Sequence, residues 1–110
     1  MKMGTKAKVK IMDNNRLIGC LNLSMDGYVG NWAAELVKAL RKTTPQKIRK
    51  SRHLFQFLSG FEEFPDRYMD YICIVDISNN VYRLWLYTSL EKPDFEGDLD
   101  AFAKKYIPPE

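Results

Sequence analysis

The side chains that most often do chemistry are few in this chain of 110 residues. His53 is the single histidine, and it lies in a basic stretch without a neighbouring acid or nucleophile to complete a catalytic pair. Cys20 and Cys73 are widely separated and each lies inside an apolar run, which is typical of buried free thiols in a reducing compartment. One histidine and two separated cysteines are a poor ligand set for a transition metal. We therefore expect no metal, no cofactor and a protein that is not an enzyme.

Carboxylates gather in two clusters. The first contains Glu62, Glu63 and Asp66, and the second spans residues 91–100. The second cluster lacks the alternating ligand spacing and the final Glu of a calcium-binding loop. Nothing in its spacing selects a pair of carboxylates for glycoside hydrolysis. We interpret it as a solvated loop that leads into a capped helix, and an enzyme remains only the third hypothesis.

Basic residues are unevenly distributed along the chain, whose net charge is +3. Residues 1–53 hold 12 Lys/Arg against 3 acids, whereas residues 54–110 hold 5 against 11. The cations of the central segment can neutralise phosphates, and they are Lys38, Arg41, Lys42, Lys47, Arg49, Lys50 and Arg52. No aromatic residue and no glycine-rich backbone segment is interleaved with these cations. An ordinary solvated helix face therefore explains the same charges. Nucleic-acid binding by residues 38–53 is our alternative hypothesis.

Aromatic residues indicate a different class of function, a protein interface. Trp and Tyr side chains dominate interface energetics when they project into a partner. The candidates are Tyr28, Trp32, Trp85 and Tyr87. Equally, these rings can form a second core layer beneath helices. The chemistry we expect is therefore recognition of a macromolecule, with a protein partner ahead of nucleic acid.

The first element that must position these residues is a hairpin. Residues 6–12 alternate, with Ala7, Val9 and Ile11 on one face and lysines on the other, as in a half-buried strand. Residues 17–24 alternate as well, but a two-residue Asn14-Asn15 turn would place their leucines on the lysine side. A shift of one residue reverses the face of a strand. We therefore predict a connection of three or five residues, with an Asn in the left-handed conformation.

A second hairpin is predicted from residues 70–77 and 81–88. A two-residue Asn79-Asn80 turn pairs Asp76 with Arg83, so that opposite charges face each other. Both faces of this hairpin are largely apolar, because a second stripe comprises Ile72, Ile74, Trp85 and Tyr87. Helices cover that stripe, or the hairpin is a central pair of strands, or the stripe is a contact surface.

Three helices are predicted around the hairpins. The first is capped by Asn31 and ends near Thr43, with an apolar stripe formed by Trp32, Ala33, Leu36, Val37 and Leu40. Thr44 and Pro45 begin the second, which stops at Gly60. Asp98 caps the third, in which Leu99, Phe102, Ala103 and Tyr106 share a face.

The resulting order is ββααββα. It predicts a single α+β domain over residues 1–110, with a four-stranded, mainly antiparallel sheet packed with helices. No apolar stretch is long enough for a membrane span, and the N-terminal residues alternate Lys with apolar side chains, unlike a signal peptide. We therefore expect a cytoplasmic protein that does not associate with membranes. The sequence does not predict an oligomeric state.

Asp26-Gly27-Tyr28 follows the second predicted strand, and a tyrosine-rich hairpin and "GDLDAFAKKY" (97–106) come later. In this layout the chain resembles a loose set of small uncharacterised bacterial and phage proteins, in which a D-G-Y-P segment follows the second strand. Val29 stands here in place of the proline. The resemblance implies no activity. By analogy, it implies a phage or mobile-element origin and a protein that acts by binding a host macromolecule.

Overall fold

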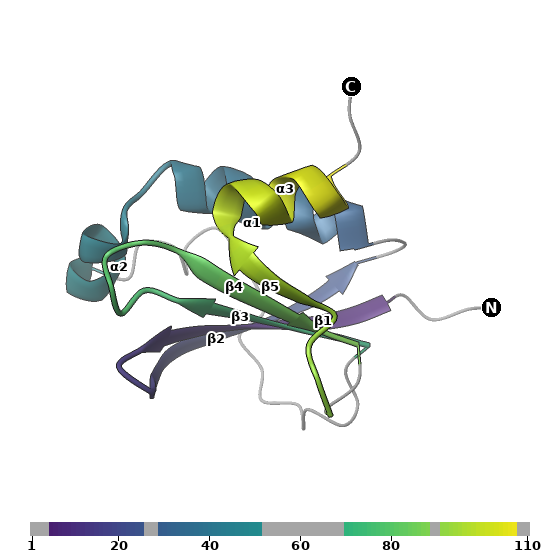
Figure 1. The fold of residues 1–110 in the computed structure, drawn as a ribbon, viewed down its shortest axis with the longest axis horizontal. Helices are drawn as coiled ribbons and strands as arrows, with labels where there is room; N and C mark the ends of the chain where they lie inside the picture. The colour runs from purple at the N-terminus through teal and green to yellow at the C-terminus, as the bar shows by residue number, and fades with distance from the viewer. Residues whose placement is uncertain (1–4, 26–28, 52–69, 89–90, 108–110) are drawn as a thin grey trace.

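The computed structural model describes residues 5–25, 29–51, 70–88 and 91–107. The elements, in chain order, are β1 (Thr5–Asp13), β2 (Arg16–Met25), α1 (Val29–Arg41), α2 (Pro45–Ser51), β3 (Tyr71–Asp76), β4 (Arg83–Tyr87), β5 (Phe95–Asp98) and α3 (Leu99–Tyr106). Helices α1 and α3 lie side by side over one face of the sheet, and α2 lies near one end of it (Figure 1). The predicted α+β class is therefore confirmed.

The sheet has five strands among the described residues, in the order β2-β1-β3-β4-β5. β1 and β3 are parallel neighbours and the other pairs are antiparallel. The prediction of four mainly antiparallel strands in ββααββα order therefore differs from the structure, which has a mixed sheet and an added strand β5. This strand lies in the acidic segment that was interpreted as a solvated loop. Its four residues include Glu96, Gly97 and Asp98, which have low β-propensity, so only pairing with β4 makes them a strand.

The first hairpin reaches the expected register by an unexpected route. Its connection has two residues, Asn14 and Asn15, both with positive φ, so the prediction of three or five residues is wrong. A β-bulge provides the register shift instead. Ile11 pairs with Gly19 and Met12 pairs with Leu17, which leaves Ile18 without a pairing partner. The extra residue shifts the face of β2, so that Val9 lies opposite Leu21. The predicted left-handed Asn is confirmed.

In the second hairpin, Asp76 does lie opposite Arg83, which confirms the predicted register. The connection is wider than a two-residue turn, because β3 ends at Asp76 and β4 begins at Arg83. A turn closes where the Asn80 N–H donates to the Ile77 carbonyl oxygen at 3.1 Å, and Asn80 has a positive φ. A tight turn centred on Asn79-Asn80 is therefore not formed.

The helices follow their apolar stripes and caps. The predicted stripe of α1 is buried in full, although α1 begins at Val29, so Asn31 lies inside the helix and is not its cap. Thr44 caps α2 by accepting the Lys47 N–H, and Asp98 caps α3 by accepting the Ala101 N–H at 2.8 Å. The predicted stop of the second helix at Gly60 and the cluster at residues 62–66 lie outside the described residues.

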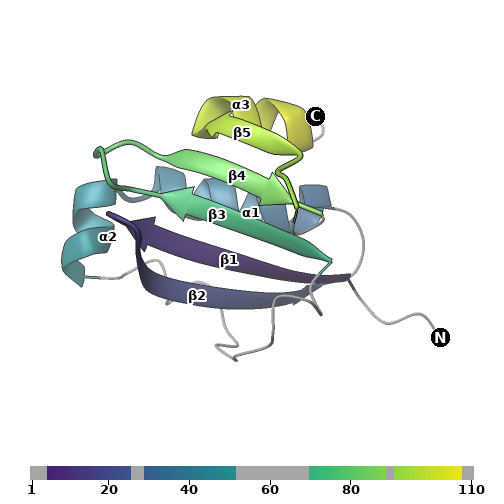
Figure 2. The ribbon, with the colours of Figure 1, turned by 60° about the horizontal axis from the view of Figure 1, so that its bottom comes forward.

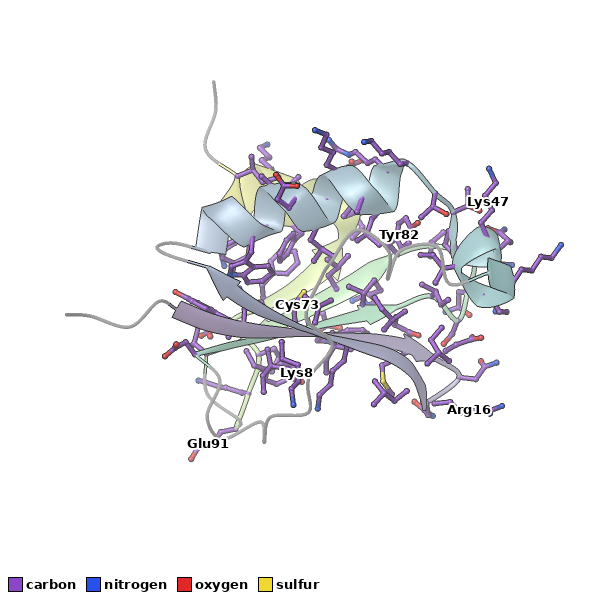
Figure 3. All side chains as sticks on the ribbon, turned by 180° about the vertical axis from the view of Figure 1, so that it is seen from behind. Lys8, Arg16, Lys47, Cys73, Tyr82 and Glu91 are labelled. Atoms are coloured by element: carbon purple, nitrogen blue, oxygen red, sulfur yellow. The ribbon has the colours of Figure 1, made fainter. Side chains whose placement is uncertain are left out.

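The core lies between one face of the sheet and helices α1 and α3. Ala7, Val9 and Ile11 of β1 are buried there, as their spacing predicted. Cys73 of β3 lies between the sheet and α1 (Figure 3). At the α3 side, the Phe102 ring contacts those of Phe95, Tyr106 and Trp32. The helical face of the sheet thus accounts for one of the two apolar stripes of the second hairpin.

Candidate functional site: the open face of the sheet

The other face of the sheet is the strongest candidate site, and we call it the open face. No described helix covers it, and α1 and α3 lie behind the sheet when it is viewed from this side (Figure 2). The strand register defines three rows of neighbours across it: Lys8, Ile72 and Tyr87; Lys10, Ile74, Trp85 and Glu96; and Leu17, Met12, Asp76 and Arg83. Lys8 points away from the helices, on the side opposite Cys73 (Figure 3).

Exposure varies from one end of the open face to the other. Ile72 and Lys8 are only 5% and 6% exposed, whereas Ile74, Trp85 and Tyr87 are half-buried. At the hairpin end, Leu17 is 55% exposed, because the bulge turns it away from the core. The open face is therefore an apolar surface that is partly accessible to a partner. A contiguous apolar patch that is exposed on a folded protein often marks an interaction site.

Charged groups hold one aromatic side chain of the open face in a defined environment. The Arg83 guanidinium lies 5.7 Å from the centroid of the Trp85 ring and donates to Glu96 Oε2 at 2.8 Å. Although Asp76 is the register partner of Arg83, its carboxylate accepts the Ser78 N–H and hydroxyl instead. Both members of the Arg83–Glu96 pair are exposed, so the pair contributes at most about 1 kcal/mol to stability. Its effect is to place a cation over the indole ring.

The four predicted partner-binding residues separate into different environments. Trp85 and Tyr87 both lie on the open face, on the same strand. Trp32 is 2% exposed and its ring packs 6.0 Å from Tyr71, so it belongs to the core and presents no surface to a partner. Tyr28 lies outside the described residues. The two-residue spacing of Trp85 and Tyr87 in the sequence predicted that they lie on the same face of the strand.

Sequence reasoning did not find the residues that β1 contributes to the open face. Lys8, Lys10 and Met12 become neighbours of Ile72, Ile74 and Asp76 through the parallel pairing of β1 with β3. These strands are separated by more than fifty residues, and no local pattern reports a parallel pairing over that distance.

The basic segment lies elsewhere, around the end of α1 and along α2. Its described cations are all exposed, and they are Lys38, Arg41, Lys42, Lys47, Arg49 and Lys50. Lys47 lies on the outer side of α2 (Figure 3). Arg41 pairs with Asp100 of α3 at 3.2 Å. Arg49 donates to both carboxylate oxygens of Asp13. Arg52 and His53 lie outside the described residues.

The titratable groups of the described residues offer little reactive chemistry. Burial raises the pKa of the Cys73 thiol, which keeps it protonated and unreactive. Asp94 accepts the hydroxyl and the N–H of Thr88, and these hydrogen bonds lower the pKa of its carboxyl. The same hydrogen bonds join residues 88 and 94 of the connection between β4 and β5. No group of three or more His, Cys, Asp or Glu within the described part of the chain is arranged to hold a metal ion.

Within the described ranges, no helix has the length and apolar character that crossing a membrane requires. Comparison of the chain with protein-family models, curated proteins and solved structures gave no match. The resemblance to small bacterial and phage proteins therefore stays a prediction.

Proposed function

We propose that this protein is a non-enzymatic binding protein that recognises another protein through the open face of its sheet. The observation that carries the proposal is the pair Trp85 and Tyr87, half-buried on a face that no described helix covers. Trp and Tyr are the side chains most enriched at the energetic centres of protein interfaces. Following the resemblance to phage proteins, we take the partner to be a cytoplasmic host protein.

The arrangement of charges favours a protein over a nucleic acid at this surface. The open face carries both signs, because Asp76 and Glu96 accompany Lys8, Lys10 and Arg83. Arg83 is already paired with Glu96, which would repel phosphates nearby. An apolar centre with charges of both signs at its border is the usual composition of a protein interface.

The test is capture of partners from a bacterial lysate treated with nuclease, with Trp85→Ala and Tyr87→Ala compared with the unaltered protein. We expect each substitution to weaken binding at least about tenfold, since truncating an interface anchor costs 2 kcal/mol or more. The matched control is Val81→Ala, because Val81 is 61% exposed on the β3–β4 connection and lies outside the rows of the open face. Circular dichroism checks that each variant folds. A partner retained equally by all variants would contradict the proposal.

Nucleic-acid binding is a second candidate function, carried by the exposed lysines of α1, α2 and the connection between them. Lys38 of α1, Lys42 of the short connection that follows it, and Lys47 and Lys50 of α2 are all exposed. Retention on DNA at low salt should then fall steeply as salt rises, because each phosphate contact releases counterions. Alanine at all four positions would abolish the retention, whereas Trp85→Ala would not affect it. Absence of any retention at low salt would exclude this function.

A further inference from the structure

Three aromatic rings pack together where β5 leads into α3, at one edge of the sheet (Figure 2). Phe102 is fully buried, and its ring centroid lies 5.5 Å from that of Phe95 and 5.0 Å from that of Tyr106. The Phe95 and Tyr106 rings lie 5.7 Å apart at an interplanar angle of 81°. Both are half-buried. Phe95 and Tyr106 thus form a corner of two nearly perpendicular rings, which we call the aromatic corner.

The backbone of β5 and α3 holds the aromatic corner in place. Phe95 and Gly97 lie on the same face of β5, and a Cβ atom on Gly97 would be only 2.9 Å from Phe95 Cζ. The Phe95 ring can therefore lie against the strand only because residue 97 has no side chain. The Asp98 cap begins α3 directly after β5 and so fixes where Tyr106 lies. A corner that is already formed costs little to order when it binds a ligand.

A cation already lies at the aromatic corner. The Lys105 ammonium is 5.4 Å from the centroid of the Tyr106 ring and 5.7 Å from that of Phe95. Both distances are within the range of about 6 Å over which an aromatic ring attracts a cation. Lys105 Nζ also donates to the Asp94 carbonyl oxygen at 3.3 Å, slightly beyond the usual limit of about 3.2 Å. Because Lys105 is exposed and its hydrogen bond to Asp94 is long, its ammonium is readily displaced.

The charges around the aromatic corner suit a positively charged ligand. Hydrogen bonds from Thr88, and to a lesser degree the charge of Lys105, lower the pKa of the Asp94 carboxyl. Burial, followed by the negative charge of Asp94, raises the pKa of Tyr106. At neutral pH the corner therefore combines two neutral rings with a nearby carboxylate.

We propose that the aromatic corner binds a trimethylammonium group, and that Lys105 occupies the corner when no ligand is bound. Such a group carries a positive charge but no N–H donor, so it gives up no hydrogen bonds to water when it moves against the rings. Aromatic side chains recognise quaternary ammonium groups in this way. The group can belong to a small molecule such as choline or to a trimethylated lysine of another protein.

The site is separate from the open face. Phe95 packs on Phe102, on the helical side of the sheet, whereas Glu96 is the neighbour of Trp85 on the open face. The proposal therefore goes beyond the proposed partner binding. Trp85→Ala should bind trimethylammonium ligands as the unaltered protein does, so failure of one proposal is distinguishable from failure of the other.

The experiment is titration with choline, followed by NMR of the Phe95 and Tyr106 ring protons. We expect Lys105→Ala to bind choline about tenfold more tightly than the unaltered protein. A site that is open in about a tenth of the molecules has its apparent affinity reduced by that fraction, and the substitution opens it. Alanine is a strong helix former, so α3 is retained. Lys104→Ala is the matched control, because it removes the same charge from the adjacent exposed position and should leave the affinity unchanged.

Two further comparisons test the role of the rings. In the Lys105→Ala background, Tyr106→Leu should remove the gain in affinity, because it keeps an apolar side chain but removes the ring. The neutral tert-butyl analogue of choline should not bind, since it has the same shape without the charge. The proposal is overturned if Lys105→Ala shows no saturable binding of choline, a result that does not depend on how Tyr106→Leu folds. An equal gain in Lys104→Ala, or equal binding of the neutral analogue, also overturns it.

A second titration identifies the source of the trimethylammonium group. Lys105→Ala is titrated with a peptide that contains one trimethylated lysine and with the same peptide unmodified. Tighter binding of the trimethylated peptide than of choline supports the site with a protein side chain as its ligand. Tighter binding of choline supports the site with a small molecule as its ligand. Equal binding of the two peptides, with no preference for the methyl groups, would contradict the proposal.

Discussion

Tyr82 connects the second hairpin to the helical layer through a single hydroxyl group. Its O–H donates to the Leu40 carbonyl oxygen at 2.8 Å, in the last turn of α1, where carbonyl groups have no partner within the helix (Figure 3). Burial raises the pKa of Tyr82 from 10.0 to about 12, because the charged phenolate is poorly solvated there. The phenol therefore stabilises the folded chain only in its protonated form.

This shift predicts a pH dependence of stability. The folded pKa is higher than the unfolded pKa, so the contribution of Tyr82 is complete below pH 10 and is lost as the pH rises from about 10 to about 12. Tyr82→Phe removes the hydrogen bond, which should cost about 1 kcal/mol at neutral pH. The variant should then lose less stability than the unaltered protein over that alkaline range. Urea unfolding at several pH values measures both effects, and parallel curves for the two proteins would contradict the prediction.

At the scale of elements, the two asparagine turns and α2 form a single junction at one end of the sheet. The Asn14 N–H donates to Ser78 Oγ at 2.7 Å, which joins the two turns directly. The Arg49 guanidinium of α2 contacts both turns, with a bidentate pair to Asp13 and further hydrogen bonds to the Ile77 carbonyl oxygen and the Asn80 side chain. Arg49 was predicted as a candidate for nucleic-acid binding, but these contacts give it a structural role.

We predict that Arg49→Ala lowers the free energy of unfolding by about 1.5–3 kcal/mol, the usual contribution of hydrogen bonds to charged groups. Arg49→Lys should recover only part of the loss, because an ammonium group cannot form the forked contact with Asp13. Lys50→Ala is the control, since it removes an exposed cation from the same helix. Urea unfolding measures all three. Equal stability of the Arg49→Ala and Lys50→Ala variants would show that the junction contributes nothing.

At the scale of the whole molecule, one core joins the sheet to both large helices. Cys73 is fully buried in β3, between β1 and β4 and beneath α1. Its thiol has a raised pKa because of burial, and the thiolate is the form that reacts. Modification of Cys73 therefore requires the core to open, which makes this thiol a reporter of cooperative unfolding.

In a Cys20→Ser background, a thiol reagent at mildly alkaline pH should modify Cys73 at least about 10³-fold more slowly in the native protein than in urea-unfolded protein, in line with the folding equilibrium of small domains. The rate should rise in parallel with the loss of circular dichroism as urea is added. A fast native rate would mean that β3 is exposed without global unfolding.

Much of the local structure followed from the sequence. The alternation of Ala7, Val9 and Ile11, the apolar stripe of α1 and the Asp98 cap were all predicted correctly, because each depends on side chains within a few residues of one another. The pairing of Asp76 with Arg83 was also correct, since the hairpin brings together segments that adjoin in the chain.

Tertiary structure decided the features that depend on distant pairing. The sequence of the first hairpin indicated that its register must shift by one residue. A bulge at Ile18 and a longer loop both produce that shift, and only the structure shows that the bulge is used. β5 is a strand only because β4 offers it an edge, and β1 lies beside β3 only in the folded chain. The open face, and with it the environment of Trp85 and Tyr87, exists because α1 and α3 both pack on the other side of the sheet. An amphipathic helix shows in its sequence which of its sides is buried, whereas a strand with two apolar faces does not show which face the helices cover.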